Sequence, residues 1–172
     1  MKNSVKTLDQ ESLYRLAIRY VERYATTRKK LADYLNRKIR EREWQDAEPP
    51  AVEPLIERFV DLGYIDDALY AQTKAAALTR RGYGARRVSL ALYQAGISEA
   101  DGAEAFQISK ENKWSAADKF ARKRKIGCYA ESQQDEDICR KQLQAFLRAG
   151  HDFDLASRFV FARPGEEITA ED

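Results

Sequence analysis

The chain has 172 residues, of which 34% are charged, and its formal net charge is only +2. This small net charge excludes a bulk polycation, so binding to nucleic acid or to an acidic partner would have to come from local basic patches. The charged fraction exceeds the average of about 25% for a domain. It fits either an elongated helical array with much surface or an ordinary domain with salt-bridged helix faces.

The cysteines and the apolar pattern bear on the cellular compartment. Cys128 and Cys139 are the two cysteines and His151 is the one histidine, which predicts neither a zinc site nor a disulfide framework. No apolar run approaches the ~18 residues of a membrane span. The N-terminal MKNSVKTLDQ lacks the apolar segment of a signal peptide. We therefore expect a cytoplasmic protein with no membrane contact.

In chain order, nearly every segment predicts an α-helix and no β-strand is expected. The first helices are expected over residues 12–25, 28–38 and 55–62. Thr27 is the expected N-cap of the second helix, the prolines predict a loop over 40–54, and Gly63 is a natural residue to follow the third helix. Apolar residues at helical spacing predict the inward faces: Leu13, Leu16, Ala17, Tyr20, Tyr24, Leu31 and Leu35.

The same pattern continues through the rest of the chain. Further helices are expected over residues 68–81, 85–95, 99–108 and 138–149, with one opened by Asn112 or Ser115 and a last one capped by Asp152. Asp66 or Asp67 is the expected cap of the helix over 68–81, and Ser98 with Asp101 forms a weak capping box. Residues 127–137 predict a polar connection and residues 162–172 a frayed acidic tail.

Basic pairs suggest that the helices repeat in groups of three. Lys29-Lys30, Arg86-Arg87 and Arg140-Lys141 recur at the expected start of each middle helix, at intervals of about 55 residues. The sequence therefore predicts an all-α fold of three tandem three-helix repeats in an elongated, curved array. The expected bounds are 1–63 for a leader and the first repeat, 64–110 for the second, 111–161 for the third, and 162–172 for a disordered tail. The alternative is a coincidence in a chain rich in lysine and arginine.

Catalytic groups are hard to find in this sequence. His151 follows a helix-ending glycine, which favours a turn or capping role over a general base. The acidic runs 66–67 and 135–137 precede helices, so capping explains them without a metal. Gly82-Tyr83-Gly84 matches no phosphate-binding fingerprint. We expect no enzyme activity, no metal and no cofactor.

The basic clusters are the better candidates for function. Four arginines (Arg80, Arg81, Arg86 and Arg87) bracket Gly82-Tyr83-Gly84, although a cation at a helix start costs about 0.3–1 kcal/mol. Free N–H groups at a helix start attract anions, and arginines there would strengthen such a site. Tyr83 could stack on a base or pack against a partner. The alternative is solvated helix ends whose charges pair with nearby carboxylates. The other candidate partner- or DNA-binding residues are Lys29, Lys30, Arg122, Lys123, Arg124, Lys125, Arg140 and Lys141.

Three stretches of the sequence resemble the RecX family of bacterial recombination regulators. These are LGYIDDALYA (62–71), RRGYGARRVSLALYQAGIS (80–98) and FLRAGHDFDLA (146–156). The resemblance covers about residues 10–161 and is strongest over 60–98. It implies three tandem three-helix repeats and no enzyme activity. It also implies a protein that binds the RecA–DNA filament along its groove and restrains strand exchange and ATP hydrolysis, in recombination, DNA repair and the SOS response. We expect a monomer.

The basic residues and the motif residues have different expected roles. Some RecX-like proteins bind single- or double-stranded DNA directly, so the basic helix starts would meet acidic groups of RecA, exposed phosphates, or both. Gly63 would end one helix, Asp66 would cap the next, and Tyr64 or Ile65 would plug the joint between repeats. The full set of expected structural residues is Gly63, Tyr64, Asp66, Asp67, Gly82, Gly84, Gly96 and Gly150.

The sequence also departs from the family pattern. The family has Ser and then Glu at the start of the first middle helix, where this chain has Thr27 and Lys30, which predicts a weaker and more positive cap. The loop after Arg42, with Trp44, is no part of the motif, and the third repeat is the least regular. A stand-alone DNA-binding protein and a helical scaffold without a nucleic-acid role are the competing hypotheses.

Overall fold

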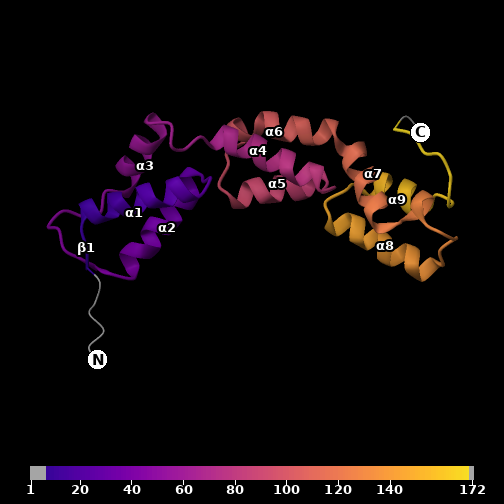
Figure 1. Cartoon of the computed structure of the whole chain (residues 1–172), viewed down its shortest axis with the longest axis horizontal. Helices are drawn as coiled ribbons and strands as arrows, with labels where there is room; N and C mark the ends of the chain where they lie inside the picture. Colours follow the sequence, from indigo (N-terminus) through magenta and orange to yellow (C-terminus); the bar gives the residue numbers. More distant parts are fainter. Residues whose placement is uncertain (1–6, 171–172) are drawn as a thin grey trace, which may run out of the picture. The chain divides into compact units, whose positions relative to one another are not determined.

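A computed structural model describes residues 7–170 of the chain (Figure 1). Nine α-helices lie within these residues, so the predicted all-helical class is confirmed. The chain divides into two compact units. The first comprises Met1–Tyr70 with Ala95–Ser98, and the second comprises Ala71–Gln94 with Glu99–Asp172.

The first unit is built on helices α1 to α3. Their bounds are Gln10–Arg23 for α1, Arg28–Arg40 for α2 and Val52–Asp61 for α3. Pro54 lies in the first turn of α3, where a missing N–H breaks no helical hydrogen bond. The loop predicted over 40–54 therefore ends earlier than expected, because a proline in the first turn does not prevent a helix.

Two short strands in the first unit contradict the expectation of no strand. β1 (Thr7–Leu8) and β2 (Glu43–Trp44) pair in parallel, with Thr7 opposite Glu43 and Leu8 opposite Trp44. Two residues are too few to show the alternation that marks a strand in a sequence. Leu8 is buried in the core of this unit, and the pair joins residues 7–8 to the loop after α2.

The predicted inward faces of the first unit are largely confirmed. Leu13, Ala17, Leu31 and Leu35 are fully buried, and they pack with Val52, Leu55, Ile56 and Phe59 of α3. Tyr24 is the exception, because it follows the last residue of α1 and is 50% exposed. The apolar stripe of α1 therefore ends in a tyrosine that faces solvent.

The caps of the first unit follow the predicted residues. Thr27 Oγ1 accepts a hydrogen bond from the N–H of Lys30 at 3.2 Å, which makes it the N-cap of α2. Asp66 Oδ1 accepts from the N–H of Leu69 at 2.8 Å and so caps α4 (Asp67–Arg80). In the connection between α3 and α4, Ile65 is buried in the core of the first unit and Tyr64 is 53% exposed. Ile65 is therefore the residue of the two that packs inside this connection.

Helices of the second unit follow one another with short connections. After the later part of α4 come α5 (Ala85–Gln94), α6 (Glu99–Glu111), α7 (Lys113–Arg124), a 3₁₀ turn (Gly127–Tyr129), α8 (Glu136–Arg148) and α9 (Phe153–Val160). α7, α8 and α9 pack together, as Figure 1 shows. Their core holds Phe120 and Phe146, with ring centroids 4.6 Å apart, and Phe159 next to Phe146 at 5.9 Å.

Two expectations for the second unit are corrected. The polar connection expected over 127–137 contains the 3₁₀ turn, and α8 begins inside it because Asp135 Oδ1 accepts from the N–H of Ile138 at 2.8 Å. Asp152 stands at the N-cap position of α9 but makes no capping hydrogen bond, since its carboxylate lies beside an arginine described below.

Residues 162–170 lie against the second unit, in contrast to the frayed tail expected there. The N–H of Gly165 donates to the carbonyl of Cys128 at 2.9 Å. Ala162 is buried and Ile168 packs on the core formed by α7 to α9. The last two residues of the expected tail, 171 and 172, lie outside the described residues.

The cap at Asp66 gives a first prediction. Asp66→Ala is expected to lower the free energy of unfolding by about 1 kcal/mol, since the N–H of Leu69 loses its acceptor. Urea unfolding followed by circular dichroism measures it. Asp66→Ser, which keeps an acceptor at the cap, should restore most of the loss. An Asp66→Ala protein as stable as wild type would contradict the capping role.

Candidate partner-binding surface

The turn Gly82-Tyr83-Gly84 is joined backbone to backbone to the turn that follows α8. The N–H of Gly84 donates to the carbonyl of Ala149 at 2.9 Å, and the N–H of Arg86 donates to the carbonyl of Gly150 at 3.2 Å. A Cβ on Gly84 would stand 2.3 Å from the Gly150 carbonyl oxygen, which no side chain can do. The close approach of the two turns therefore requires glycine at position 84.

Gly82 and Gly150 are constrained by conformation as well as by space. Their φ angles are +87° and +92°, a region that side chains disfavour. A Cβ on Gly150 would lie 2.3 Å from the backbone nitrogen of Arg87, and a Cβ on Gly82 would lie 3.1 Å from that of Phe120. The turn that carries the arginines is thus held in one conformation by α7, α8 and the start of α5.

His151 adds a side-chain link to this contact. Its Nε2–H donates to the carbonyl of Gly82 at 2.9 Å, and its ring packs against Phe120 and Phe146. The residue is 2% exposed, and its Nδ1 has no hydrogen-bond partner within the described part of the chain. Burial lowers the pKa of His151, against a smaller opposing effect of the hydrogen bond to Gly82. The histidine is a neutral structural residue, in agreement with the turn role expected for it.

The N–H groups of both arginines at the start of α5 already have acceptors. That of Arg86 donates to Gly150, and that of Arg87 donates to the carbonyl of Gly84 at 3.0 Å. At the start of α2 the N–H of Arg28 donates to the carboxylate of Asp67 at 3.0 Å. The expectation that free N–H groups attract an anion is wrong at these positions, because tertiary contacts occupy them. Any attraction must come from the side chains.

Three arginines of the turn carry free charge. Arg80, Arg81 and Arg87 are exposed, and none of them makes an ion pair with another residue in the range 7–170. The guanidinium carbons of Arg81 and Arg87 lie 5.5 and 6.0 Å from the ring centroid of Tyr83. Tyr83 is half-buried and packs on the core of the second unit. Its ring positions the two arginines, and we refer to Arg80, Arg81 and Arg87 as the basic turn.

Arg86 differs from the other three arginines. Its guanidinium lies 3.3 Å from the carboxylate of Asp152, with both side chains largely exposed. An exposed pair of this kind contributes about 0–1 kcal/mol to stability. The pair still lowers the charge that Arg86 offers to a partner, so this arginine fits the alternative of a solvated helix end.

The basic pair of α2 is engaged inside the first unit. Lys29 forms an ion pair with Asp33 at 2.5 Å, and the Lys30 ammonium donates to the Tyr70 hydroxyl. The side chain of Lys29 also covers Gly96, where a Cβ would lie 2.4 Å from the Lys29 Cβ. Nearby, Thr27 Oγ1 donates to the carbonyl of Ala95 at 2.6 Å. A glycine turn therefore packs on the start of α2, as the Gly150 turn packs on the start of α5.

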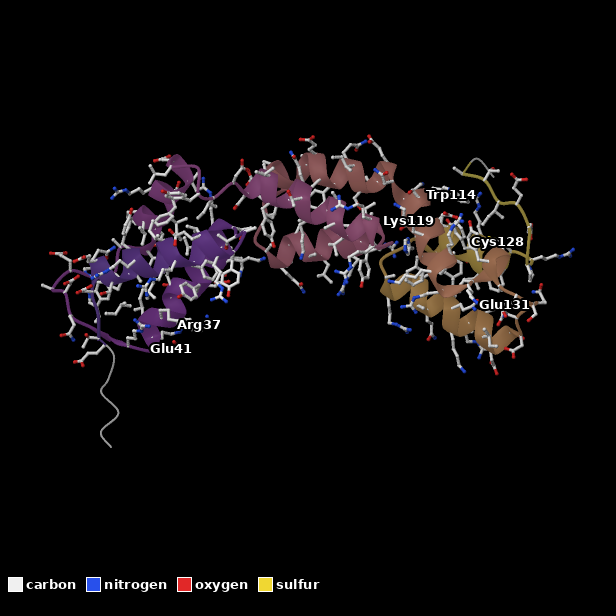
Figure 2. All side chains as sticks on the ribbon, in the orientation of Figure 1. Arg37, Glu41, Trp114, Lys119, Cys128 and Glu131 are labelled. Atoms are coloured by element: carbon white, nitrogen blue, oxygen red, sulfur yellow. The ribbon has the colours of Figure 1, made fainter. Side chains whose placement is uncertain are left out.

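The run 122–125 at the end of α7 is mostly paired. Arg122 lies 3.5 Å from Asp118, Arg124 lies 4.7 Å from the ring centroid of Phe120, and Lys125 pairs with Glu131. Within residues 7–170, Lys123 is the one member of this run that makes no ion pair and no contact with an aromatic ring. Lys119 and Glu131, labelled in Figure 2, come from α7 and the following loop. The geometry here favours solvated, paired charges.

Arg140 and Lys141 do not start a helix, so this part of the repeat marker is wrong. α8 begins at Glu136, which places the pair in its second turn. Arg140 lies 3.9 Å from Glu136 and 3.3 Å from Asp137. The first turn of α8 is acidic, which suits the positive end of the helix dipole.

The described residues hold no group of three metal-ligating side chains and no helix that is both long and apolar enough to cross a membrane. They define a helical protein in which three exposed arginines without ion pairs lie on one turn fixed by backbone hydrogen bonds, a class of protein that fits an anionic partner. No protein-family model matches the chain.

Comparison with known proteins identifies the family. The chain is 34% identical over 165 residues to the regulatory protein RecX of Agrobacterium fabrum strain C58, covering 94% of this chain and 84% of the relative. It is 30% identical over 159 residues to the regulatory protein RecX of Myxococcus xanthus strain DK1622, covering 86% and 83%. The chain belongs to the RecX family of regulatory proteins.

Solved structures share the fold. The crystal structure of RecX from Lactobacillus salivarius matches with a TM-score of 0.60 at 20% identity, over 87% of this chain and 93% of that one. A second crystal structure, of a regulatory protein RecX, matches with a TM-score of 0.62 at 21% identity, over 85% and 68%.

The contact between the two turns gives a second prediction. Gly84→Ala should lower the free energy of unfolding by about 1–3 kcal/mol, because the new methyl group collides with the Gly150 carbonyl. The matched control is Gly63→Ala, whose φ is +75° with no atom within 4 Å of the added Cβ. It should cost only about 1 kcal/mol, by backbone strain alone. Equal losses in urea unfolding would contradict the packing role of Gly84.

The buried histidine gives a third prediction, on pH. Because the folded-state pKa of His151 lies below its usual value, the unfolded chain takes up a proton that the folded protein does not as the pH falls through about 6.5. Stability should therefore fall between about pH 7 and 5, by at most about 1.4 kcal/mol per pH unit. Asp9 and Glu41 have lowered pKa values, so their protonation affects stability only at pH values below this window.

The control for this prediction is His151→Gln. The amide can still donate toward Gly82 but does not titrate, so thermal melts of the variant should be nearly independent of pH between about 7 and 5. His151 is the one histidine of the chain, so no second imidazole can mask the result. A wild type with the same melting temperature across this window would contradict the burial of a neutral imidazole.

Proposed function

We propose that this protein regulates homologous recombination and DNA repair by binding the RecA–DNA filament and inhibiting strand exchange and ATP hydrolysis by RecA. In this role it acts by binding and catalyses no reaction. Its relatives at 34% and 30% identity are named regulatory proteins RecX, and the sequence motifs resemble that family along most of the chain. The partner surface is then one that offers carboxylates, phosphates, or both.

The basic turn is the observation that carries the proposal. Arg80, Arg81 and Arg87 are exposed and without ion pairs in the described residues, while most of the other predicted cations are paired. The backbone bonds of Gly84 and the ring of Tyr83 hold the turn in place before any partner arrives. A preorganised surface loses less conformational entropy on binding, so its charges contribute more to affinity.

Direct binding to DNA is the second candidate function. The same three guanidinium groups fit phosphates as well as carboxylates. This alternative requires affinity for naked duplex DNA, with a steep dependence on salt.

The test is single-strand-dependent ATP hydrolysis by RecA, titrated with wild type and with a triple variant, Arg80→Gln, Arg81→Gln and Arg87→Gln. Wild type should inhibit, and the variant should need at least about tenfold more protein for half-maximal inhibition, equivalent to about 1.4 kcal/mol of binding. Circular dichroism checks that the variant is folded, since it loses the contacts with Tyr83.

The matched control removes three other charges from the second unit: Lys74→Gln, Lys110→Gln and Arg148→Gln. These side chains are exposed and lie outside the basic turn, so the control should inhibit like wild type. Equal weakening in both variants would mean that only net charge matters. If wild type leaves RecA unaffected but binds naked duplex with a steep salt slope, direct DNA binding replaces the proposal.

A further inference from the structure

The first unit contains a pocket that none of the predicted binding residues lines. It has a volume of about 450 Å³ and lies between the last turn of α1, the residue after it, and α2. This volume is within the range of about 300–1,000 Å³ that is usual for small-ligand sites. The lining residues are Arg19, Tyr20, Arg23, Tyr24, Tyr34 and Arg37.

Three of the residues that line the pocket are tyrosines. Tyr20 stacks on Tyr34 with ring centroids 4.4 Å apart and an interplanar angle of 22°. Tyr24 lies 5.3 Å from Tyr20 and is 50% exposed. The first two rings pack α1 against α2, which is an ordinary structural role. Tyr24 extends the aromatic row beyond the end of α1 into solvent, where packing does not require it.

The remaining lining residues are all arginines, and no carboxylate lines the pocket. Arg23 lies 5.6 Å from the ring centroid of Tyr24, and Arg37 lies 5.6 Å from that of Tyr34. Arg19 and Arg23 form no ion pair with any other residue from 7 to 170. Arg37, labelled on α2 in Figure 2, reaches Glu41 only at 3.7 Å. Positive charge is thus concentrated beside the exposed ring.

This combination fits one kind of ligand better than others. An unpaired base offers a flat π face to an aromatic ring, and its phosphates offer negative charge to arginines. In a duplex the base faces are covered by neighbouring pairs, so the tyrosines would have nothing to stack on. An acidic peptide would satisfy the arginines and leave the row of rings without a role.

We propose that this pocket binds an unpaired nucleotide of a single-stranded nucleic acid, with the base stacked on Tyr24 and the phosphates beside Arg19 and Arg23. The site is separate from the basic turn, since it belongs to the first unit and uses none of the same residues. The inference goes beyond the proposed function and is tested without RecA, so either can fail alone.

The first test measures stacking. Binding of the full-length protein to fluorescein-labelled oligo(dT) is followed by fluorescence anisotropy, with a duplex of equal length as the comparison. Tyr24→Ala should weaken binding to oligo(dT) by at least about fivefold, the lower end of what a stacked base contributes. Tyr24→Phe keeps the ring and should bind like wild type. Neither change should alter binding to the duplex.

The second test measures charge. The double variant Arg19→Gln and Arg23→Gln should reduce the slope of log affinity against log salt by about 1.4, since each phosphate contact on a single strand contributes about 0.7. Arg15 and Arg58 are exposed arginines of the same unit that do not line the pocket. Changing both to Gln should leave the slope unchanged. Because these substitutions are on the surface, this test holds even if Tyr24→Ala proves unstable.

Several results would overturn the proposal. The first is that the wild-type protein does not bind oligo(dT), and the second is that it binds duplex and single strand with equal affinity. The third is that a folded Tyr24→Ala variant binds oligo(dT) as tightly as the wild-type protein does. Displacement of oligo(dT) by polyglutamate as readily as by unlabelled oligo(dT) would assign the pocket to an acidic chain instead.

Discussion

The contact between the Gly84 turn and the Gly150 turn is the interaction on which the described surface of the second unit depends. Backbone meets backbone there, because neither residue has a side chain to hold the two turns apart. The carbonyls of Ala149 and Gly150 accept hydrogen bonds from the N–H groups of Gly84 and Arg86, so these backbone groups are paired where the two turns meet. His151 closes the same contact from inside the core through its bond to Gly82. The backbone that carries the arginines of the basic turn is fixed because it forms one side of this contact.

Hydrogen bonds to the first N–H groups also explain how basic residues can stand at the starts of α5 and α2, where the helix dipole disfavours them. At α5 the N–H groups that carry the positive end of the dipole donate to the carbonyls of Gly84 and Gly150. At α2 the carboxylate of Asp67 and the hydroxyl of Thr27 take the same role. In both cases the partial positive charge is already balanced, so the cost of the nearby cations is reduced. At α5 this leaves the side chain of Arg87 exposed and without an ion pair among the described residues.

The two units present different chemistry to a partner. The second unit offers guanidinium groups on a fixed turn with an aromatic ring beneath them, which suits an anionic surface of any kind. The first unit offers guanidinium groups beside an exposed ring, with two further rings stacked behind it, which suits a flat, charged ligand. Tyr83 and Tyr24 differ in burial, and that difference separates a residue that positions arginines from one that can stack on a ligand. A regulator of a nucleoprotein filament would have use for both surfaces.

The sequence alone determined what depends on neighbours along the chain. Helical spacing placed Leu31 and Leu35 in the core, capping chemistry placed Thr27 and Asp66, and the motifs indicated the family, because each of these is a local pattern. Tertiary structure alone decided which cations are free. The pairing of Arg86 with Asp152, the bond from His151 to Gly82 and the stacking of Tyr20 on Tyr34 join residues far apart in the sequence, and no periodicity records such contacts. The β1–β2 pair escapes prediction for the same reason, since two residues carry no pattern and the pairing joins residues far apart in the sequence.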